Sequence, residues 1–343
     1  MNKNKKVTII GGCGFIGHNL GAHLKEKYNC DVTLIDSFQV NNFLSILSDV
    51  DGVGNPKLSK FIIEDRINFI QKNKIKIKTI DARDYHALTN CIKEDIPDYI
   101  VHLAAVSHSN RSNKDPHSTF DHSFRTLENA LDISKGKVKK FIYLSSSMVY
   151  GNFKKEKVDE NEICEPIGIY GALKLSGEMI VKAYNQVFGL PYIIIRPSAL
   201  YGERCISRRV SQVFVENALS NKEIIINGNG EERLDFTYIK DLIEGISLSI
   251  FNDKVSNEIF NLTYGHSRTI NTLLEITKKN FENIKIRYQS WDKLMPKRGT
   301  LSIDKAKKLL GYSPTWNLEK GFNNYISWYK KLYSHYRNNE DGS

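Results

Sequence analysis

The sequence predicts an α/β protein of the Rossmann type, in which a doubly wound parallel sheet is joined to a smaller α/β substrate-binding lobe. Three observations lead to this prediction. In the first half of the 343-residue chain, short apolar strands alternate with helical segments, which is typical of a parallel sheet covered on both faces. A glycine-rich stretch joins the first strand to the first helix. After about residue 190 the alternation gives way to polar loops and shorter elements.

Each element of the first half follows from its pattern of apolar residues. Strands are expected at residues 6–10, 32–36, 75–81, 98–105 and 140–147, and helices at 15–28, 85–94 and 124–135. The long connection at 37–74 contains two helical patterns, at 41–49 and 58–73. We therefore expect an elaborated crossover there rather than a disordered loop.

The second half contains a further strand at 191–197 and helices at 208–220 and 268–279. The chain is expected to return to the main sheet between about 233 and 262. The predicted domains are a first domain of 1–190 with about 235–262, a second lobe of about 191–234 and 263–335, and a flexible tail at 336–343.

The composition limits the classes of partner that we expect for this protein. Lys and Arg outnumber Asp and Glu by 49 to 39, but no basic block is interleaved with aromatic residues, so we expect no nucleic-acid partner. No apolar run approaches the ~20 residues that span a bilayer. The apolar N-terminal run ends at Gly11 without a signal-peptide cleavage site. We therefore expect a cytoplasmic protein with no membrane partner. The five scattered cysteines form no C-x-x-C pair, so we expect no metal site.

The stretch GGCGFIG at 11–17 contains the G-x-G-x-x-G pattern of dinucleotide-binding loops, in the required place between a strand and a helix. Such glycines allow a tight turn and let a pyrophosphate approach the N–H groups at the start of the helix. A purely structural turn is the alternative. Asp36 ends the second strand, where a carboxylate accepts hydrogen bonds from the adenosine ribose and repels a 2′-phosphate. This predicts NAD rather than NADP.

Two weaker signals concern the same cofactor. Asp81 ends the third strand, where it can meet the adenine amino group. The small residues of Leu103-Ala104-Ala105 end the fourth strand, which lets a cofactor lie against the edge of the sheet. A simple packing role is the alternative for both.

A second motif carries chemistry. Tyr170 and Lys174 form Y-x-x-x-K within a helical pattern, and a spacing of four puts both side chains on one helix face. An ammonium near a phenol lowers the pKa of the phenol and makes it a usable general base and acid. The serines at 145–147 end the fifth strand, at the sheet edge where ligands bind in open α/β folds. A serine hydroxyl there can hold a substrate oxygen, or it can satisfy a turn.

Together these motifs resemble the extended short-chain dehydrogenase/reductase family, and within it the NAD-dependent nucleotide-sugar epimerases and dehydratases of the UDP-glucose 4-epimerase type. The resemblance covers about residues 5 to 330. The stretches that carry it are Gly11-x-x-Gly14-x-x-Gly17, Asp36, Leu103-Ala104-Ala105, SSSMVYG (145–151), Tyr170-x-x-x-Lys174 and RPSALYG (196–202).

The resemblance implies roles and partners. Its catalytic residues are Ser146, Tyr170 and Lys174. Its NAD-binding residues are Gly11, Gly14, Phe15, Ile16, Gly17, Asp36, Asp81, Ala82, Leu103, Ala104 and Ala105, with Tyr170 and Lys174. The second lobe would carry a nucleotide-diphosphate sugar, held by Ser147, Ser198, Arg233 and Arg298. The family also implies a homodimer, formed through the helix near 120–135 and the helix that carries Tyr170.

The reaction is predicted partly by elimination. In the family, Tyr170 would take the proton of the sugar 4-hydroxyl while the C4 hydride passes to NAD. The 4,6-dehydratases usually follow the catalytic hydroxyl with Asp-Glu, and UDP-glucuronate decarboxylases carry a Glu at the position of Met148. This chain has Ser147-Met148, neither of which is a general acid. A nucleotide-sugar 4-epimerase is therefore the prediction; a 4,6-dehydratase, a 4-dehydrogenase and a catalytically silent NAD-binding protein are the alternatives.

Some positions depart from the family pattern. His122 stands where many relatives have Asn, and Ala199 replaces an Asn that commonly helps to bind substrate, so the sugar preference is open. His108 is a candidate for the sugar site, although a lone loop histidine is more often a bystander. The arginines of GERCISRR at 202–209 add positive charge without an assigned role.

Overall fold

A seven-stranded sheet dominates the computed structural model, which describes residues 4–47, 55–107, 109–291 and 294–341. Its strands lie in the order β12-β7-β5-β4-β1-β2-β3, and every neighbouring pair is parallel. The strands are β1 (Lys6–Ile10), β2 (Asp31–Asp36), β3 (Lys76–Thr79), β4 (Tyr99–His102), β5 (Lys140–Leu144), β7 (Tyr192–Arg196) and β12 (Glu258–Asn261). The predicted doubly wound parallel sheet is confirmed.

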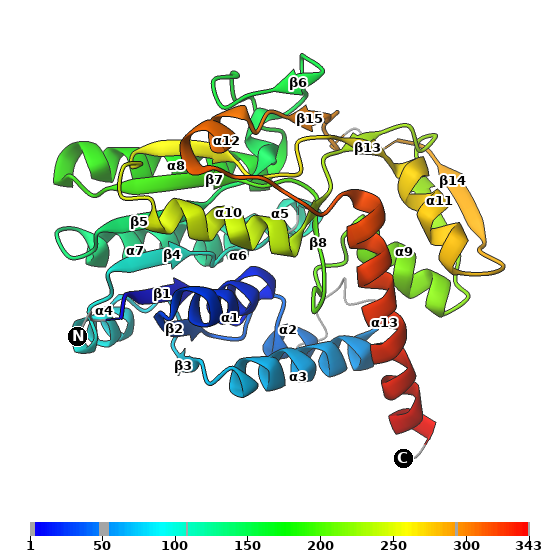
Figure 1. Ribbon diagram of the computed structural model, residues 1–343, viewed down its shortest axis with the longest axis horizontal. Helices are drawn as coiled ribbons and strands as arrows, with labels where there is room; N and C mark the ends of the chain where they lie inside the picture. The colour runs from blue at the N-terminus through cyan, green and yellow to red at the C-terminus, as the bar shows by residue number, and fades with distance from the viewer. Residues whose placement is uncertain (1–3, 48–54, 108, 292–293, 342–343) are drawn as a thin grey trace.

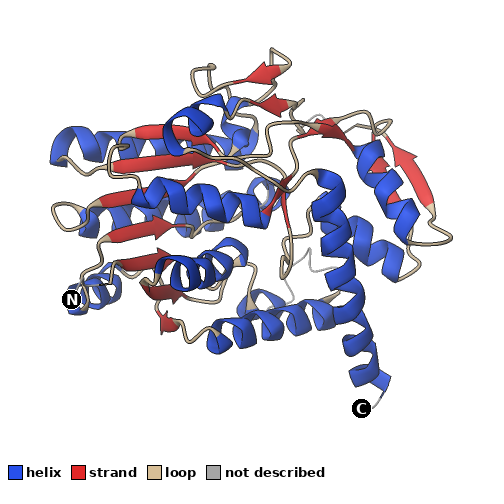
Figure 2. Cartoon of the chain, viewed as in Figure 1, coloured by secondary structure: helices blue, strands red, loops and turns tan. Residues whose placement is uncertain are grey.

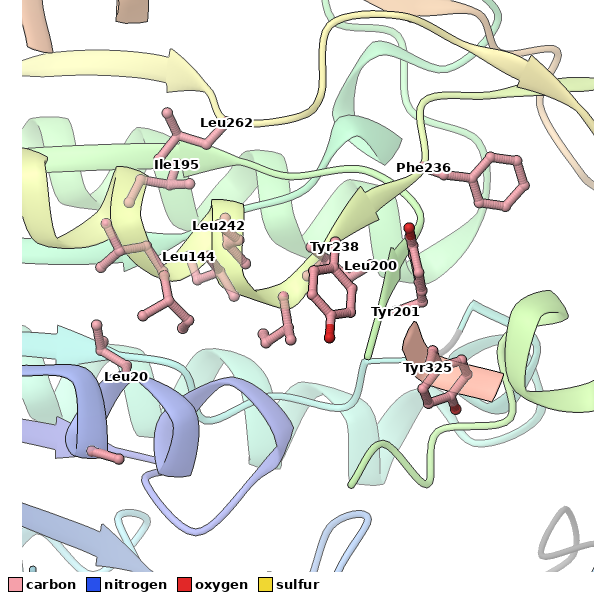
Figure 3. Packing of buried hydrophobic residues seen from close by; sticks show 14 of the residues in the cluster. Leu20, Leu144, Ile195, Leu200, Tyr201, Phe236, Tyr238, Leu242, Leu262 and Tyr325 are labelled. Atoms are coloured by element: carbon pink, nitrogen blue, oxygen red, sulfur yellow. The ribbon is translucent and has the colours of Figure 1, made fainter. Parts of the chain in front are cut away.

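Helices cover both faces of this sheet (Figures 1 and 2). The helices α1 (Phe15–Tyr28) and α10 (Ile239–Phe251) pack together on one face, and α4 (Tyr85–Glu94), α7 (Thr126–Ser134) and α8 (Gly168–Phe188) form the layer on the other. Alternate strand residues point to opposite faces. In β5, Ile142 and Leu144 join the first core, and Phe141 and Tyr143 join the second. Leu144 lies near Leu20 of α1 and Leu242 of α10 in Figure 3.

The long connection between β2 and β3 is helical, as predicted. It contains α2 (Phe43–Leu47) and α3 (Pro56–Lys72), while residues 48–54 lie outside the described part. The region after β4 is more broken than expected. Three short elements precede α7, namely α5 (Ser109–Lys114), α6 (Pro116–Phe120) and the π-helical turn η1 (Asp121–Arg125). After β5 comes the 3-10 turn η2 (Ser147–Tyr150).

The remaining elements form smaller units beside the main sheet. The strand β9 (Ile224–Asn227) is parallel to β14 (Ile286–Gln289), and α9 (Val210–Leu219) and α11 (Ile270–Asn280) lie next to them at the right of Figure 1. Three short pairs join distant segments: β6 (Lys157–Val158) with β15 (Thr300–Leu301), β8 (Leu200–Tyr201) with β11 (Thr237–Tyr238), and β10 (Arg233–Leu234) with β13 (Arg268–Thr269). The chain ends with α12 (Asp304–Leu310) and α13 (Leu318–Asp341).

Two expected boundaries differ from the structure. The strand expected at 191–197, which we had assigned to the second lobe, forms β7 of the main sheet, between β12 and β5. Without β7 beside it, β5 would be an edge strand, and its residues, all of which are buried in the structure, would be exposed. The tail expected at 336–343 is helical as far as Asp341, because α13 continues through it. The other domain boundaries stay predictions.

A buried ion pair connects α8 to the strands beneath it. The side chains of Arg196 and Glu178 are 3% and 1% exposed, and the Arg196 guanidinium donates to both carboxylate oxygens of Glu178, at 2.9 and 2.6 Å. The Ser145 hydroxyl donates to the same carboxylate at 2.5 Å. The bidentate geometry and the added hydroxyl satisfy two charges that would be costly to bury alone.

Removing one partner of this pair is expected to destabilise the fold. Glu178→Ala leaves the Arg196 charge buried without a counter-charge, and should lower the free energy of unfolding by about 3–5 kcal/mol in denaturant titrations. Lys157→Ala is the control, because it removes an exposed ion pair with Asp304 (Nζ–Oδ2, 2.7 Å) and should cost less than about 1 kcal/mol. Equal losses in the two variants would contradict the assignment.

Candidate active site

One cavity of about 820 Å³ runs along the carboxyl ends of the central strands and continues toward α9 and β9. This is the sheet edge at which open α/β folds bind their ligands, and the volume falls in the range of small-molecule sites. Apart from His108, which lies outside the described residues, every residue that the sequence analysis assigned to cofactor, catalysis or substrate lines this cavity. These residues are Gly11, Gly14, Phe15, Ile16, Gly17, Asp36, Asp81, Ala82, Leu103, Ala104, Ala105, Ser146, Ser147, Tyr170, Lys174, Ser198, Arg233 and Arg298. Their common location is now established, whereas their individual roles stay predictions.

The glycine loop forms the floor of one end of the cavity. Gly11 has φ +79°, and a side chain there would put Cβ 2.6 Å from the backbone nitrogen of Ala104. A Cβ on Gly17 would lie 2.4 Å from the carbonyl oxygen of Gly12, so helix α1 can approach the loop this closely only with glycine. Helix α1 begins at this point without a side-chain cap and without an acidic residue in its first turn. The loop therefore fits the pyrophosphate of a dinucleotide.

Asp36 is fixed beside this loop by backbone donors. Its Oδ2 accepts from the backbone N–H of Cys13 at 2.9 Å, and its Oδ1 accepts from that of Phe38 at 2.7 Å. Each carboxylate oxygen keeps a lone pair for a further donor, such as a ribose hydroxyl. Asp81 is less free, because Arg83 donates to both of its oxygens and Gln39 donates to Oδ2 at 3.1 Å. A contact of Asp81 with adenine would compete with these bonds.

The catalytic candidates meet in the middle of the cavity. Ser146 follows β5, and its Oγ accepts from the backbone N–H of Met148 at 3.2 Å. Tyr170 and Lys174 are one turn apart on α8, as the spacing predicted, and both line the cavity together with Ser146. The buried Lys174 ammonium donates to the carbonyl oxygen of Leu144 at 2.6 Å. One hydroxyl, one phenol and one ammonium thus share a small volume.

The electrostatics of this group include a cation that the sequence analysis did not assign. Burial raises the pKa of Tyr170, and the charge of Arg209 and the hydrogen bond with Ser146 oppose that rise. The lowering of the phenol pKa that we expect from Lys174 stays a prediction. Burial lowers the pKa of Lys174 itself to about 8, while the Glu178 carboxylate raises it. Arg209, which had no assigned role, is thus a cation that lowers the pKa of the phenol.

The arginines expected to grip a diphosphate line the other end of the cavity. Arg233 is partly committed, because its Nε donates to Ser267 Oγ at 3.0 Å and an NH2 group donates to the Ser267 carbonyl at 2.7 Å. Arg298 has a buried Nε with no acceptor among the described residues. Burial, together with the charge of Arg209, lowers the pKa of Arg298 to about 10. An anion bound here would relieve the repulsion between Arg209 and Arg298.

Arg66 is a site residue that the sequence analysis missed. It lies on α3, is wholly buried, and lines the cavity. Its guanidinium donates to the carbonyl oxygens of Cys13 at 3.1 Å, Asn41 at 3.4 Å and Arg204 at 2.7 Å. It thus ties the glycine loop to the loop that follows β8. The signal was present in the sequence, because Arg66 occupies the apolar stripe of Leu58, Ile62 and Ile70 at helical spacing.

The positions that depart from the family pattern also lie here. Ala199 lines the cavity with φ +38°, a left-handed conformation that Asn adopts more readily than Ala. His122 lines it from the π-helical turn η1, and burial lowers its pKa. His108 lies outside the described residues. In the described part of the chain, no three His, Cys, Asp or Glu side chains gather as metal ligands.

Comparison with known proteins agrees with this architecture. The sequence model of the NAD dependent epimerase/dehydratase family matches residues 7–263. An uncharacterized UDP-glucose epimerase of Bacillus subtilis is 28% identical over 332 residues, which are 96% of this chain and 99% of that protein. The dTDP-glucose 4,6-dehydratase of Salmonella typhimurium is 25% identical over 354 residues, which are 94% of this chain and 92% of that protein.

A solved structure extends the likeness to the whole fold. The UDP-glucuronic acid 4-epimerase of Bacillus cereus, in complex with UDP-glucuronic acid and NAD, superposes with a TM-score of 0.84 at 26% identity. The match covers 96% of this chain and 100% of that one. No helix in the described part of the chain is long and apolar enough to cross a membrane. The family match covers most of the chain, including the glycine loop, Ser146, Tyr170 and Lys174, so the protein belongs to the NAD-dependent epimerase/dehydratase family of extended short-chain dehydrogenases/reductases.

Proposed function

We propose that the protein is a cytoplasmic nucleotide-sugar 4-epimerase. The observation that carries this proposal concerns the surroundings of Ser146, Tyr170 and Lys174. Among the described residues, no carboxylate that lines the cavity belongs to the same region as these three side chains. The acidic side chains that do line it belong to other regions, either the ends of β2 and β3 or the loop before β10. They are Asp36, Asp81, Glu231 and Glu232. A 4-epimerase needs a hydroxyl, a phenol and an ammonium, but no further acid.

The family's cofactor, NAD, supplies a hydride acceptor and donor next to the sugar when it is bound. The glycine loop and Asp36 would hold its adenosine diphosphate half, and Lys174 would hold the nicotinamide ribose. The residues of the chain carry out the proton transfers. Tyr170 accepts the proton of the sugar 4-hydroxyl, and Ser146 keeps that oxygen beside the phenol. The 4-keto sugar would then turn over in the site, so that the opposite face of C4 is presented for the return of the hydride, and Tyr170 returns the proton to the 4-oxygen.

Met148 argues against the dehydratase alternative. Removing water across C5 and C6 requires an acid and a base near those carbons, and the residues after Ser146 are Ser147 and Met148, both buried in the 3-10 turn η2. A thioether cannot carry a proton, and a serine hydroxyl is too weak an acid. The Salmonella dehydratase shows that the family includes such enzymes, so the choice rests on these side chains and not on overall similarity.

The substrate class follows from the cations at the far end of the cavity. We propose a nucleotide-diphosphate sugar whose phosphates are held by Arg233 and Arg298, with Ser147 and Ser198 beside the sugar. Both serines are buried at the cavity wall. The Bacillus cereus structure contains UDP-glucuronic acid, which makes UDP-sugars the first compounds to try.

Proton NMR of the protein with UDP-, GDP-, dTDP- and CDP-sugars in D₂O tests the reaction. The expected result is a sugar with inverted C4 and no deuterium at C5, because a 4-epimerase does not break the C5–H bond. A 4-keto product with deuterium at C5 or C6 would identify a dehydratase. Bound cofactor that never changes redox state with any sugar would identify a silent NAD-binding protein.

Tyr170→Phe tests the assigned base. Removing the phenolic hydroxyl should lower kcat by roughly 10²–10⁴-fold, since this is the usual contribution of a positioned acid or base, while NAD remains bound. Tyr143→Phe is the matched control, because it removes a buried hydroxyl from β5 outside the cavity and should leave kcat within a factor of a few. Full turnover in Tyr170→Phe would refute the role.

Asp36 is proposed to select NAD over NADP. The wild type should bind NAD at least tenfold more tightly, because the carboxylate repels a 2′-phosphate and accepts from the free ribose hydroxyls. In calorimetric titrations of apoprotein, Asp36→Ala should bring the affinities for NAD and NADP closer together, mainly by weakening the binding of NAD. Equal wild-type affinities for the two cofactors would remove the role of Asp36.

We further propose a homodimer through α8 and the helical segment near 120–135, which contains η1 and α7. Met179 and Phe188 on α8 are 63% and 48% exposed, and Phe120 is 44% exposed while stacked on Phe124. Exposed apolar side chains on neighbouring helical segments are typical of an interface. Sedimentation should give about twice the 39.3 kDa chain mass, and Met179→Glu should give monomer. Tyr288→Glu, at an exposed site on β14, should stay dimeric. A monomeric wild type would exclude the dimer.

A further inference from the structure

Arg209 occupies an unusual electrostatic position in the cavity. It is the residue that caps the start of α9, and its side chain lines the cavity together with Tyr170 and Arg298. Its charge acts on the Tyr170 phenol at the reacting end and on the Arg298 guanidinium at the diphosphate end. One side chain therefore lies within electrostatic range of both ends of the site.

The other arginines of this wall are already engaged. Arg66 donates to three carbonyl oxygens, and Arg204 pairs with Asp65 at 2.7 Å. Arg208 lies 4.0 Å from the Glu216 carboxylate, and Arg233 donates twice to Ser267.

Arg209 and Arg298 differ from these four, because their guanidinium groups make no hydrogen bond or ion pair with the described residues. The Nε of each is buried without an acceptor, as is that of Arg66. Two neighbouring guanidinium groups that lack acceptors and repel each other form a site whose charge an anion must balance.

The start of α9 adds to the same field. Its first turn contains no acidic residue, and Arg209 makes no side-chain cap there, so its first N–H groups have no carboxylate partner. Val210 and Ser211 of this turn line the cavity. The helix end alone would not define a site, but it favours the same sign of charge as the two arginines.

We propose that Arg209 binds an anionic oxygen group of the substrate at the point where the sugar joins the diphosphate. This proposal rests on the proposed nucleotide-sugar substrate and makes it more specific. Arg233 and Arg298 would hold the diphosphate from the nucleotide side, whereas Arg209, which lines the cavity together with Tyr170, would hold it from the sugar side. The anionic group belongs to one of two sources: the phosphate next to the sugar, or a carboxylate carried by the sugar itself.

Binding measurements without turnover separate these sources. Wild type, Arg209→Met and Arg208→Met, each loaded with NAD, are titrated with UMP, UDP, UDP-glucose and UDP-glucuronic acid by calorimetry. Methionine keeps much of the length of arginine and removes the charge. Arg208→Met is the control, because it removes the same charge one residue away, where the side chain faces Glu216, and it should change every affinity by less than twofold.

Two results support the proposal. If Arg209 holds the phosphate next to the sugar, Arg209→Met lowers the affinity for UDP at least tenfold and changes the affinity for UMP by less than twofold. If Arg209 holds a sugar carboxylate, the affinities for UDP and UDP-glucose change by less than twofold, and only the affinity for UDP-glucuronic acid falls tenfold.

Two other results overturn it. Unchanged affinities for all four compounds would mean that Arg209 touches no anion. A loss for UMP as large as that for UDP would mean a general disturbance of the nucleotide site, and the melting temperature of the variant checks for this. A wild type that binds none of the four compounds would instead overturn the proposed substrate class, which distinguishes the two failures.

Discussion

The buried ion pair between Glu178 and Arg196 is the constraint on which the catalytic end of the molecule depends. Tyr170, Lys174 and Glu178 follow one another at intervals of four residues on α8, so the carboxylate that anchors the helix stands on the face that carries the chemistry. Arg196 ends β7, and Ser145 directly follows the neighbouring strand β5. The pair thereby fixes the phenol and the ammonium relative to the strand ends, at a place where small displacements of reacting groups are costly.

A second set of bonds organises the cofactor end in a comparable way. Arg66 reaches from the inserted helix α3 to carbonyl oxygens of the glycine loop and of the loop after β8. Neither loop belongs to a strand or helix, so each needs an outside support to keep its shape. The inserted segment between β2 and β3 is therefore more than a connection: it braces the two loops that face each other across the cavity.

Much of the fold and of the site could be predicted from sequence, because both depend on local patterns. The alternation of strands and helices, the glycine loop and the Y-x-x-x-K spacing each act within one turn or one strand. What could not be predicted depends on contacts between distant segments. Arg209 comes to line the same cavity as Tyr170 only after α8 and α9 have packed around it, and Asp81 accepts a hydrogen bond from the distant Gln39. The membership of β7 in the sheet is likewise decided by its neighbours.

The strand order has a consequence for how the chain can fold. β7 and β12 are adjacent in the sheet, yet the residues between them build β8, α9, β9 and α10. Until β12 arrives, β7 is an edge strand, and its Ile193, Ile194 and Ile195, all fully buried in the finished protein, form a flat apolar edge. Such edges recruit other chains. A ribosome-bound or truncated chain that ends before residue 258 would present this edge to solvent, and so the inserted segment must fold quickly if the sheet is to close without aggregation.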